Sequence, residues 1–317
     1  MKYNNRGNKA TKDGFSEGLV ELGRKYDDII SLGADITSSV GMDGFANSFP
    51  HRFLSMGIAE QNCIGVAAGL ALSGKVPVFS TYGVFAALRT TDQIRISLCY
   101  NKLHAIIGGA HAGVSVGPDG ATHQALEDIA VLRSLPNITI LSPADATQTV
   151  QATIAAYEQC EGPVYVRFGR AEVPDFMLSD IDFKVGKAQL LKEGSDLTII
   201  ATGHMVWEAL LASELLLDIG ITARVINMHT IKPIDIDTII NAAKETKGII
   251  TAEEHQIMGG LGSAVAEVVV KTNPIPMEMI GMKDQFGESG QPDELMYKYG
   301  LNANEIVKKA KKLLQYE

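Results

Sequence analysis

The side chain best placed to do chemistry is Glu60, within the sequence GIAEQN at residues 57–62. It precedes a run of small, uncharged residues at 63–72, which other backbone or another subunit can approach closely. A carboxylate beside such a surface loses water, and this desolvation raises its pKa toward neutrality. A carboxyl group of that kind can share a proton with a bound base. The structural alternative is that the helix dipole favours glutamate in any first turn.

The densest group of polar side chains lies at residues 111–124, on a glycine-rich segment after a predicted strand. It holds His111, Asp119 and His123 on the side of an α/β sheet where ligands bind. Thr122 is placed to cap a helix beginning near His123, which would direct the imidazole toward the mouth of a cleft. A turn at Asp119 and an exposed histidine are the structural alternatives. Three polar residues on one loop favour a functional interpretation.

Two further clusters stand where predicted strands end. Tyr82 and Phe85 are one helical turn apart, and an aromatic ring there can stack on a flat heterocycle or simply fill the core. Arg167 and Arg170 stand at the end of another predicted strand, where arginine suits a phosphate or sulfonate, although a surface ion pair is the common alternative. The glycine-rich segment 259–263 can cap a helix and bind an anion, or reflect close packing.

The elements that would position these residues alternate between short β-branched runs and longer amphipathic runs. Strands are predicted at residues 29–32, 52–56, 76–80, 104–107, 138–141 and 164–167, with helices at 15–26, 59–72, 85–100, 124–135 and 144–159. After a weaker pattern at 174–194, strands are predicted at 197–201, 223–227 and 248–251, with helices at 206–217, 262–270 and 303–314. We therefore predict an α/β fold with two domains, residues 1–180 and 181–317, each a mostly parallel sheet flanked by helices.

Composition restricts the class of protein. The 317 residues are 46% hydrophobic and 21% charged, as in globular proteins, and the formal net charge of −9 disfavours nucleic acid and anionic membranes as partners. Three scattered cysteines without a CxxC pair argue against a disulfide framework and a cysteine zinc site. Residues 1–14 are polar, unlike a secretory signal, and no uninterrupted apolar segment is long enough to span a bilayer. We expect a cytoplasmic enzyme or enzyme subunit.

Several stretches, taken in order, resemble the transketolase family of thiamine diphosphate enzymes, and they are most similar to the C-terminal half of transketolase encoded as a separate chain. They are GIAEQN, DGATHQALEDIAVLRSLPN, SPADA, VYVRFGR, EEHQIMGGLGSAVAE and FGESGQPDELMYKYGL. The resemblance covers almost the whole chain. It implies a pyrimidine-binding domain at 1–180, a transketolase C-terminal domain at 181–317, and transfer of a two-carbon ketol unit from a ketose, expected to be phosphorylated, to an aldose.

The resemblance also implies roles for individual residues. Glu60 matches the carboxyl that hydrogen-bonds the pyrimidine ring and favours the tautomer that removes the proton from the thiazolium carbon. Phe85 matches the aromatic residue that stacks on the pyrimidine, and Tyr82 a second wall of that pocket. Asp119 and His123 match residues that contact sugar hydroxyls near the reacting carbons. The group that holds the distal phosphate of the substrate is matched by His111, Arg170, Ser39 and Lys12.

Lys12 stands where the family usually has arginine, so the charge is kept but the bidentate fork is lost. Pro118 and Leu88 also depart from the family, at positions that often hold glutamate and a third aromatic residue. These differences leave the expected cofactor unchanged. They leave open the identity of the sugar and of its anionic end.

In this family a GDG motif and paired asparagines hold the diphosphate and its divalent metal. Here Asn4-Asn5 is the single Asn-Asn pair, and no GDG precedes it. We therefore expect this chain to hold no metal, and an N-terminal transketolase subunit carrying the diphosphate-binding domain to hold the diphosphate and Mg²⁺. Two copies of each chain are expected in the assembly. Gly65 and Gly69 would allow a subunit contact, or tight packing within the domain.

Three alternatives stay open. Two of them share the same chemistry: the beta subunit of a 2-oxo acid dehydrogenase, and the C-terminal part of deoxyxylulose-phosphate synthase. From a different class, the chain is a non-catalytic partner of a paralogous enzyme. The resemblance favours carbohydrate metabolism, and the pentose phosphate pathway and a specialised catabolic route stay open as its setting. No role is assigned to His51, His104, His204, His229 or His255.

Overall fold

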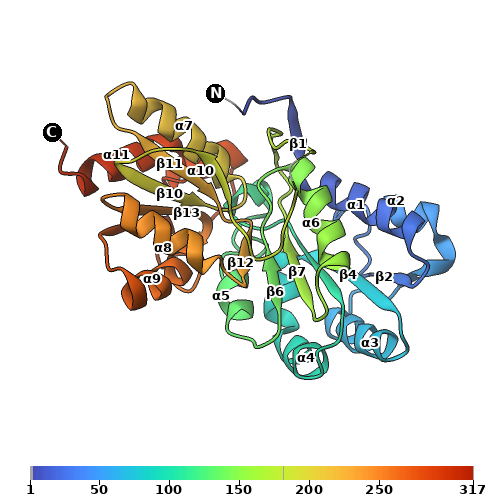
Figure 1. The fold of residues 1–317 in the computed structure, drawn as a ribbon. Coiled ribbons are helices and arrows are strands. Elements are labelled where there is room, and N and C mark those ends of the chain that lie inside the picture. Colours follow the sequence, from blue (N-terminus) through green and yellow to red (C-terminus); the bar gives the residue numbers. More distant parts are fainter. Residues whose placement is uncertain (1–2, 181, 317) are drawn as a thin grey trace.

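A computed structural model describes residues 3–180 and 182–316. The larger sheet has seven strands in the spatial order β12-β6-β7-β5-β4-β2-β3 (Figure 1). They are β2 (Ile29–Gly33), β3 (Phe53–Ser55), β4 (Val76–Tyr82), β5 (Ile106–Ala110), β6 (Thr139–Leu141), β7 (Val164–Arg167) and β12 (Thr230–Lys232). These strands pair in parallel, except that β12 runs antiparallel to β6. A short antiparallel ribbon joins β1 (Asn8–Ala10) to β8 (Glu172–Pro174).

Helices cover both faces of this sheet, as the alternating sequence pattern predicted. On one face α1 (Thr11–Lys25) lies against α6 (Ala146–Glu158), with α2 (Asp43–Ser48) and the 3₁₀ turn Pro50–Arg52 beside α1 (Figure 1). A Cβ at Gly18 would lie 2.9 Å from Thr153 Cβ, so the two helices pack closely there. The other face is covered by α3 (Glu60–Leu72), the helical segment 85–100 and α5 (Asp128–Arg133).

The second half of the chain builds a five-stranded sheet in the order β14-β13-β10-β11-β9. Its strands are β9 (Gln189–Lys192), β10 (Leu197–Ala201), β11 (Ala223–Asn227), β13 (Ile249–Gln256) and β14 (Met277–Met282). Its helices are α7 (Met205–Leu217), α8 (Ile236–Glu245), α9 (Leu261–Thr272), α10 (Pro292–Lys298) and α11 (Ala303–Leu313). Of the described strands in this sheet, β9 is the antiparallel one. The predicted fold class, two mostly parallel α/β units, is confirmed.

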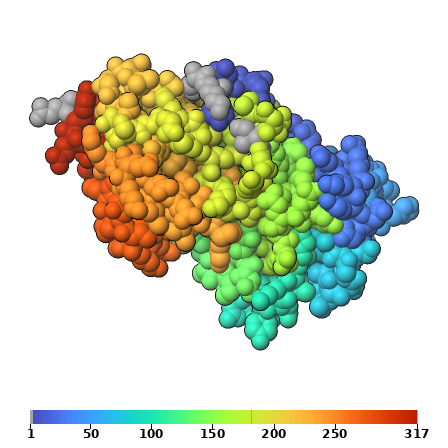
Figure 2. Space-filling view, in the orientation of Figure 1, coloured from blue at the N-terminus to red at the C-terminus, as the bar shows by residue number. Residues whose placement is uncertain are grey.

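The two halves are joined through the large sheet and through a shared core. Strand β12 comes from the second half but completes the edge of the first sheet beside β6. One apolar cluster also runs from Ile64 of α3 to Ile239 of α8 and Val265 of α9. Figure 2 shows the first half of the chain, blue to green, on the right of the view and the last third, orange to red, on the left. The predicted boundary between 180 and 181 stays a prediction, and Ile181 lies outside the described residues.

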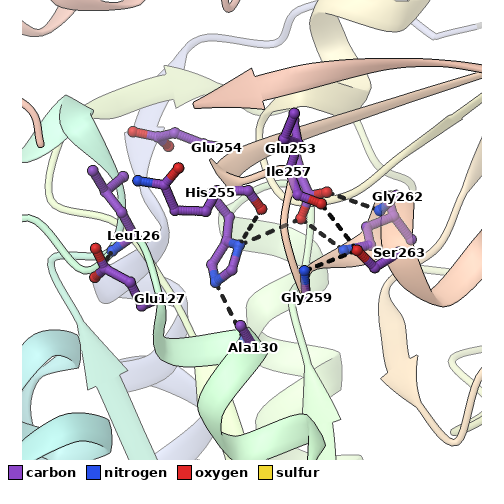
Figure 3. Close-up of polar contacts among 12 residues, drawn as sticks. Leu126, Glu127, Ala130, Glu253, Glu254, His255, Ile257, Gly259, Gly262 and Ser263 are labelled. Atoms are coloured by element: carbon purple, nitrogen blue, oxygen red, sulfur yellow. Dashed lines mark hydrogen bonds and ion pairs between the residues drawn. The ribbon is translucent and has the colours of Figure 1, made fainter. Parts of the chain in front are cut away.

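A buried polar network lies between the halves (Figure 3). The Glu253 carboxylate accepts hydrogen bonds from Leu261 N at 2.7 Å and Gly262 N at 2.8 Å, at the start of α9. The chain's own carboxylate therefore occupies the helix terminus that segment 259–263 offered to an anion, and close packing is the correct interpretation. His255 Nε2 accepts from Ala130 N at 3.3 Å, which ties β13 to α5.

Two predicted helices differ from the structure. Segment 85–100 is helical but uneven, because Phe85–Arg89 and Ile94–Tyr100 are π-helical around α4 (Thr91–Gln93). Such wide turns are frequent at functional sites. The helix predicted at 124–135 begins only at Asp128 and ends at Arg133. Within the described residues, no helix combines the length and apolarity needed to cross a lipid bilayer.

Candidate functional site

The site residues expected from the sequence gather at the carboxyl edge of the large sheet. They are Lys12 at the start of α1, Ser39 after β2, Glu60 after β3, Tyr82 at the end of β4, Phe85 just beyond it, His111, Asp119 and His123 after β5, and Arg170 after β7. The chain order reverses between β2 and β4, and ligands of open α/β sheets bind at such a crevice. At this crevice Ser39 Oγ and Tyr82 OH lie 3.2 Å apart, within hydrogen-bond distance.

Four rings form the centre of this arrangement. Tyr82 stacks on His111 with ring centroids 4.3 Å apart, and lies 5.9 Å from Phe85. The His123 ring meets Tyr82 and Phe85 edge-on, at 5.5 and 5.4 Å. Offset-stacked and edge-to-face geometries are the favourable ones for aromatic pairs. The structure therefore brings together four residues from two segments that the sequence suggested separately.

Glu60 is joined to this ring cluster by an arginine. The glutamate opens α3 and exposes only 4% of its surface. Arg89 Nη1 donates to Glu60 Oε1 at 2.8 Å, and the Arg89 guanidinium lies 4.1 Å from the centroid of the Phe85 ring. Gln61 Nε2 donates to the Arg89 carbonyl at 3.1 Å and so fixes the backbone of this turn. The buried carboxylate and the aromatic face therefore lie on either side of one flat cation.

His111 is the most deeply buried member of the site, with 1% of its surface exposed. Burial lowers the pKa of His111 to about 4, and the nearby charges of Arg170 and Lys12 act in the same direction. Its Nε2 lies 3.0 Å from the Ser39 carbonyl oxygen, whereas Nδ1 has no hydrogen-bond partner among the described residues. The single N–H of the neutral imidazole is therefore donated to the Ser39 carbonyl, and Nδ1 is left as an acceptor, so His111 in this state offers an anion neither a charge nor a hydrogen-bond donor.

The cationic side of the site is formed by Arg170 and Lys12. Arg170 Nη1 donates to Asp119 Oδ1 at 3.0 Å, and 45% of the arginine side chain is exposed. Exposed pairs of this kind contribute about 0.2–1 kcal/mol, so an incoming anion can compete for the guanidinium. Lys12 is the second residue of α1, and its N donates to the carbonyl of Gly169, two residues after β7, at 3.3 Å.

The expected helix cap at Thr122 is wrong. Because α5 begins at Asp128 and residues 121–123 form a turn, Thr122 has no helix terminus to cap. Its hydroxyl instead lies 2.9 Å from His123 Nδ1. This hydrogen bond still orients the imidazole, but through a direct contact rather than through a helix.

Sequence reasoning missed two contacts of the site and its surroundings. Arg89 had no assigned role, although it lies four positions after Phe85, the spacing that brings side chains together on a helix. Arg167 is buried, and its Nε donates to Asp128 Oδ2 at 2.9 Å. Burial alone would raise the pKa of Asp128, but Arg167 holds it below its usual value. Arg167 therefore has a structural role, because its guanidinium donates to Asp128 and to the carbonyls of Ala125 and Glu254.

No three histidine, cysteine, aspartate or glutamate side chains lie close enough to hold a metal ion in the part of the chain that the structure describes. The residues at the carboxyl edge of the sheet offer one buried carboxylate, a set of aromatic faces, two imidazoles and two cations. This combination suits a flat, nitrogen-containing ring beside a polyhydroxylated anion.

Comparisons with known proteins place the chain in a family. Residues 8–175 match the transketolase pyrimidine binding domain, and residues 186–306 match the transketolase C-terminal domain. A putative transketolase C-terminal section from Methanocaldococcus jannaschii is 45% identical over 307 residues, covering 95% of each chain. A 6-deoxy-6-sulfo-D-fructose transketolase subunit from Clostridium sp. (strain MSTE9) is 40% identical over 299 residues, covering 94% of this chain and 92% of the relative.

A solved structure described as a split gene transketolase, inactive beta4 tetramer, has a TM-score of 0.90 and 47% identity to this chain, and the match covers 97% of this chain and 99% of that one. The resemblance expected from the sequence motifs is confirmed. The chain therefore belongs to the transketolase family, of which it carries the pyrimidine-binding and C-terminal domains.

Proposed function

We propose that this chain is the C-terminal subunit of a two-chain transketolase, which moves a two-carbon ketol unit from a ketose to an aldose with thiamine diphosphate. The observation that carries the proposal is the buried Glu60 carboxylate beside the Phe85 ring, with His123 at the edge of the same ring. Transketolase-family relatives that cover nearly the whole chain support it.

The contacts of Arg89 test whether an aminopyrimidine fits here. A guanidinium is flat and carries N–H groups, as an aminopyrimidine does. Arg89 lies over the Phe85 ring at 4.1 Å while it donates to Glu60 at 2.8 Å. The space between Phe85 and Glu60 therefore accommodates a flat group that stacks on one and hydrogen-bonds the other. We infer that the pyrimidine of thiamine diphosphate makes both contacts.

When bound, thiamine diphosphate supplies a nucleophilic carbon for breaking and forming the bond beside a ketose carbonyl. Glu60 hydrogen-bonds a ring nitrogen of the cofactor and exchanges a proton with it at the carboxyl oxygen. His123, oriented by Thr122, contacts hydroxyls of the sugar near the reacting carbons, together with Asp119.

The distal anion of the sugar binds to Arg170 and Lys12, with the Ser39 hydroxyl as a hydrogen-bond donor. His111 lines this part of the site, and it would donate to the anion only if its N–H left the Ser39 carbonyl. Two cations on one side of the site complement a phosphate or a sulfonate. The relative from Clostridium is named for a sulfonated sugar, which supports an anionic sugar substrate here.

A partner subunit supplies the diphosphate and metal site, because GDG and its paired asparagines are absent from the sequence. Helix α3 offers the contact surface. A Cβ at Gly65 or Gly69 would meet no described atom within 4 Å, so these glycines are not packed inside the domain. Ile58, two residues before α3, and Leu72, the last residue of α3, are 75% and 74% exposed. We propose that this face binds the partner, with two copies of each chain.

Reconstitution tests the proposal. This chain alone should show no ketol transfer with thiamine diphosphate and Mg²⁺, and adding an N-terminal transketolase chain should restore it. Substantial transfer by the chain alone would refute the partner requirement. Gly69→Leu should weaken assembly, seen by sedimentation, while the melting temperature of the lone chain stays unchanged. Unaffected assembly would remove α3 from the interface.

A further inference from the structure

The loop that carries Asp119 and His123 rests on the second half of the chain. Loop 283–291, between β14 and α10, lies directly against loop 117–124. A Cβ at Gly120 would be 2.5 Å from Ser289 Oγ, and one at Gly117 would be 3.2 Å from the Gly290 carbonyl oxygen. Both glycines have positive φ, 81° and 74° for Gly117 and Gly120, which side chains rarely adopt. The two loops therefore approach at backbone distance.

Gln124 connects these loops. It is 2% exposed, and its Nε2 donates to the Glu288 carbonyl at 2.9 Å and to the Val114 carbonyl at 3.2 Å. A Cβ at Gly287 would overlap Gln124 Oε1, so the glycine leaves room for the amide. One buried side chain, next to His123 in the sequence, is thus bonded to both halves.

Residues of strand β13 make hydrogen bonds to the same region. Gln256 N donates to the Leu126 carbonyl at 2.9 Å, while Gln256 Nε2 donates to the Gln285 carbonyl at 2.8 Å. Ser115 N donates to Glu254 Oε1 at 2.6 Å. Figure 3 shows the His255 side chain of β13 pointing to Ala130 of α5. The loop with Asp119 and His123 is therefore fixed to the second half before it, within it and after it.

We infer that loop 283–291 sets the position of loop 117–124. Gln124 is the positioning residue, because its hydrogen bonds to both halves fix the loop that carries His123 and Asp119. This rests on the proposed function for its catalytic consequence, but the positioning itself is a property of this chain. Residues that present catalytic groups need support by buried contacts, because small displacements of a reacting geometry cost large factors in rate. The second half of the chain would then act on substrate binding without touching the substrate.

The test compares two buried glutamines in the assembled two-chain protein. Gln124→Met keeps the volume of the side chain but removes its hydrogen bonds. Gln148→Met is the matched control, because Gln148 is also buried and bonds between the halves, to Gln189 at 2.7 Å, but lies away from the loop. Hydrogen exchange of amides 117–124 should be faster by about tenfold or more in Gln124→Met and unchanged in Gln148→Met.

In ketol transfer, Gln124→Met should raise the KM for the donor sugar by about tenfold while the KM for thiamine diphosphate stays within about twofold. Unchanged exchange in loop 117–124, an unchanged sugar KM, or an equal effect of Gln148→Met would overturn the inference. If the parent protein shows no ketol transfer, the proposed function fails and the exchange comparison alone decides the positioning. If Gln124→Met does not fold, Gly287→Ala breaks the same contact from the other loop.

Discussion

Arg89 bridges Glu60 and the Phe85 ring, at 2.8 Å from the Glu60 carboxylate oxygen and 4.1 Å from the ring centroid. In the lone chain this arginine occupies the position that the proposed function gives to the pyrimidine. Binding of the cofactor therefore requires the guanidinium to move, and 45% of its side chain already faces solvent. The pair keeps a buried carboxylate from being left without a partner.

We expect Arg89→Met to tighten binding of thiamine diphosphate to the assembled protein by about fivefold, since about 1 kcal/mol of ion pairing no longer has to be broken. Isothermal titration calorimetry measures this directly. Arg95→Met, an exposed arginine on the same helical segment, is the control and should leave binding unchanged. Weaker binding in Arg89→Met would mean that the arginine orients Glu60 rather than competing with the cofactor.

Glu60→Gln should lower kcat by about 10²–10⁴-fold in the presence of the partner, because an amide does not exchange a proton with a ring nitrogen. The amide oxygen still accepts from Arg89, so the melting temperature should change little. Glu305→Gln is the matched control, because Glu305 also lies in the first turn of a helix, α11. Full activity of Glu60→Gln would support the alternative that Glu60 serves only the helix dipole.

Arg170→Ala should raise the KM for a phosphorylated or sulfonated sugar by about 10–100-fold, the loss expected for a charged hydrogen bond. The KM for thiamine diphosphate should be nearly unchanged, and a neutral sugar should be used as well as before. Arg6→Ala removes a comparably exposed arginine, paired with Asp175 at 3.2 Å, and serves as control. A larger effect on the cofactor than on the sugar would overturn the assignment.

Buried histidines predict how stability depends on pH. Burial lowers the pKa of His229 to about 4, and its ring lies 4.1 Å from the Phe183 ring. Between the ordinary value of 6.5 and about 4, the unfolded chain binds a proton there and the folded chain does not. The free energy of unfolding therefore falls as pH is lowered through this window, by up to about 1.4 kcal/mol per pH unit.

Urea unfolding of His229→Gln between pH 7 and pH 4.5 should show a shallower loss than the parent. Burial raises the pKa of the Asp145 and Glu253 carboxyls, to about 6 and about 7, so these groups change the stability in the opposite direction. Because both carboxyls are present in the parent and in the variant, the difference between the two slopes reports His229. Exposed His51→Gln is the control, and should retain the slope of the parent. Identical slopes for the parent and His229→Gln would contradict the prediction.

The fold class followed from the sequence because buried parallel strands and amphipathic helices leave strong periodic signals. Strand β12 escaped because three residues without alternation give no period, and its pairing with β6 is set by tertiary contact. The helix predicted at 124–135 was too long, again because tertiary contacts set the structure of its first residues. Gln124 is as buried as an apolar core residue, but its amide group makes hydrogen bonds between two loops. Local helix propensity does not encode such contacts.

The site was predictable to the extent that its residues follow strands. Tyr82, His111 and Arg170 all stand just past β-branched runs, so their meeting at one sheet edge is a consequence of parallel topology. The contact between Arg89 and Glu60 was not predictable in this way, since 29 positions separate the two residues in the sequence. The burial of His111 likewise depends on Tyr82 lying over it.

Strand β12 has a consequence for dissecting the molecule. A recombinant fragment that stops before Thr230 would leave the outer edge of β6 bare, and an uncovered edge recruits strands from other molecules. Such a truncation should aggregate even though most of the large sheet is intact. The halves are therefore one cooperative unit, to be engineered or swapped together.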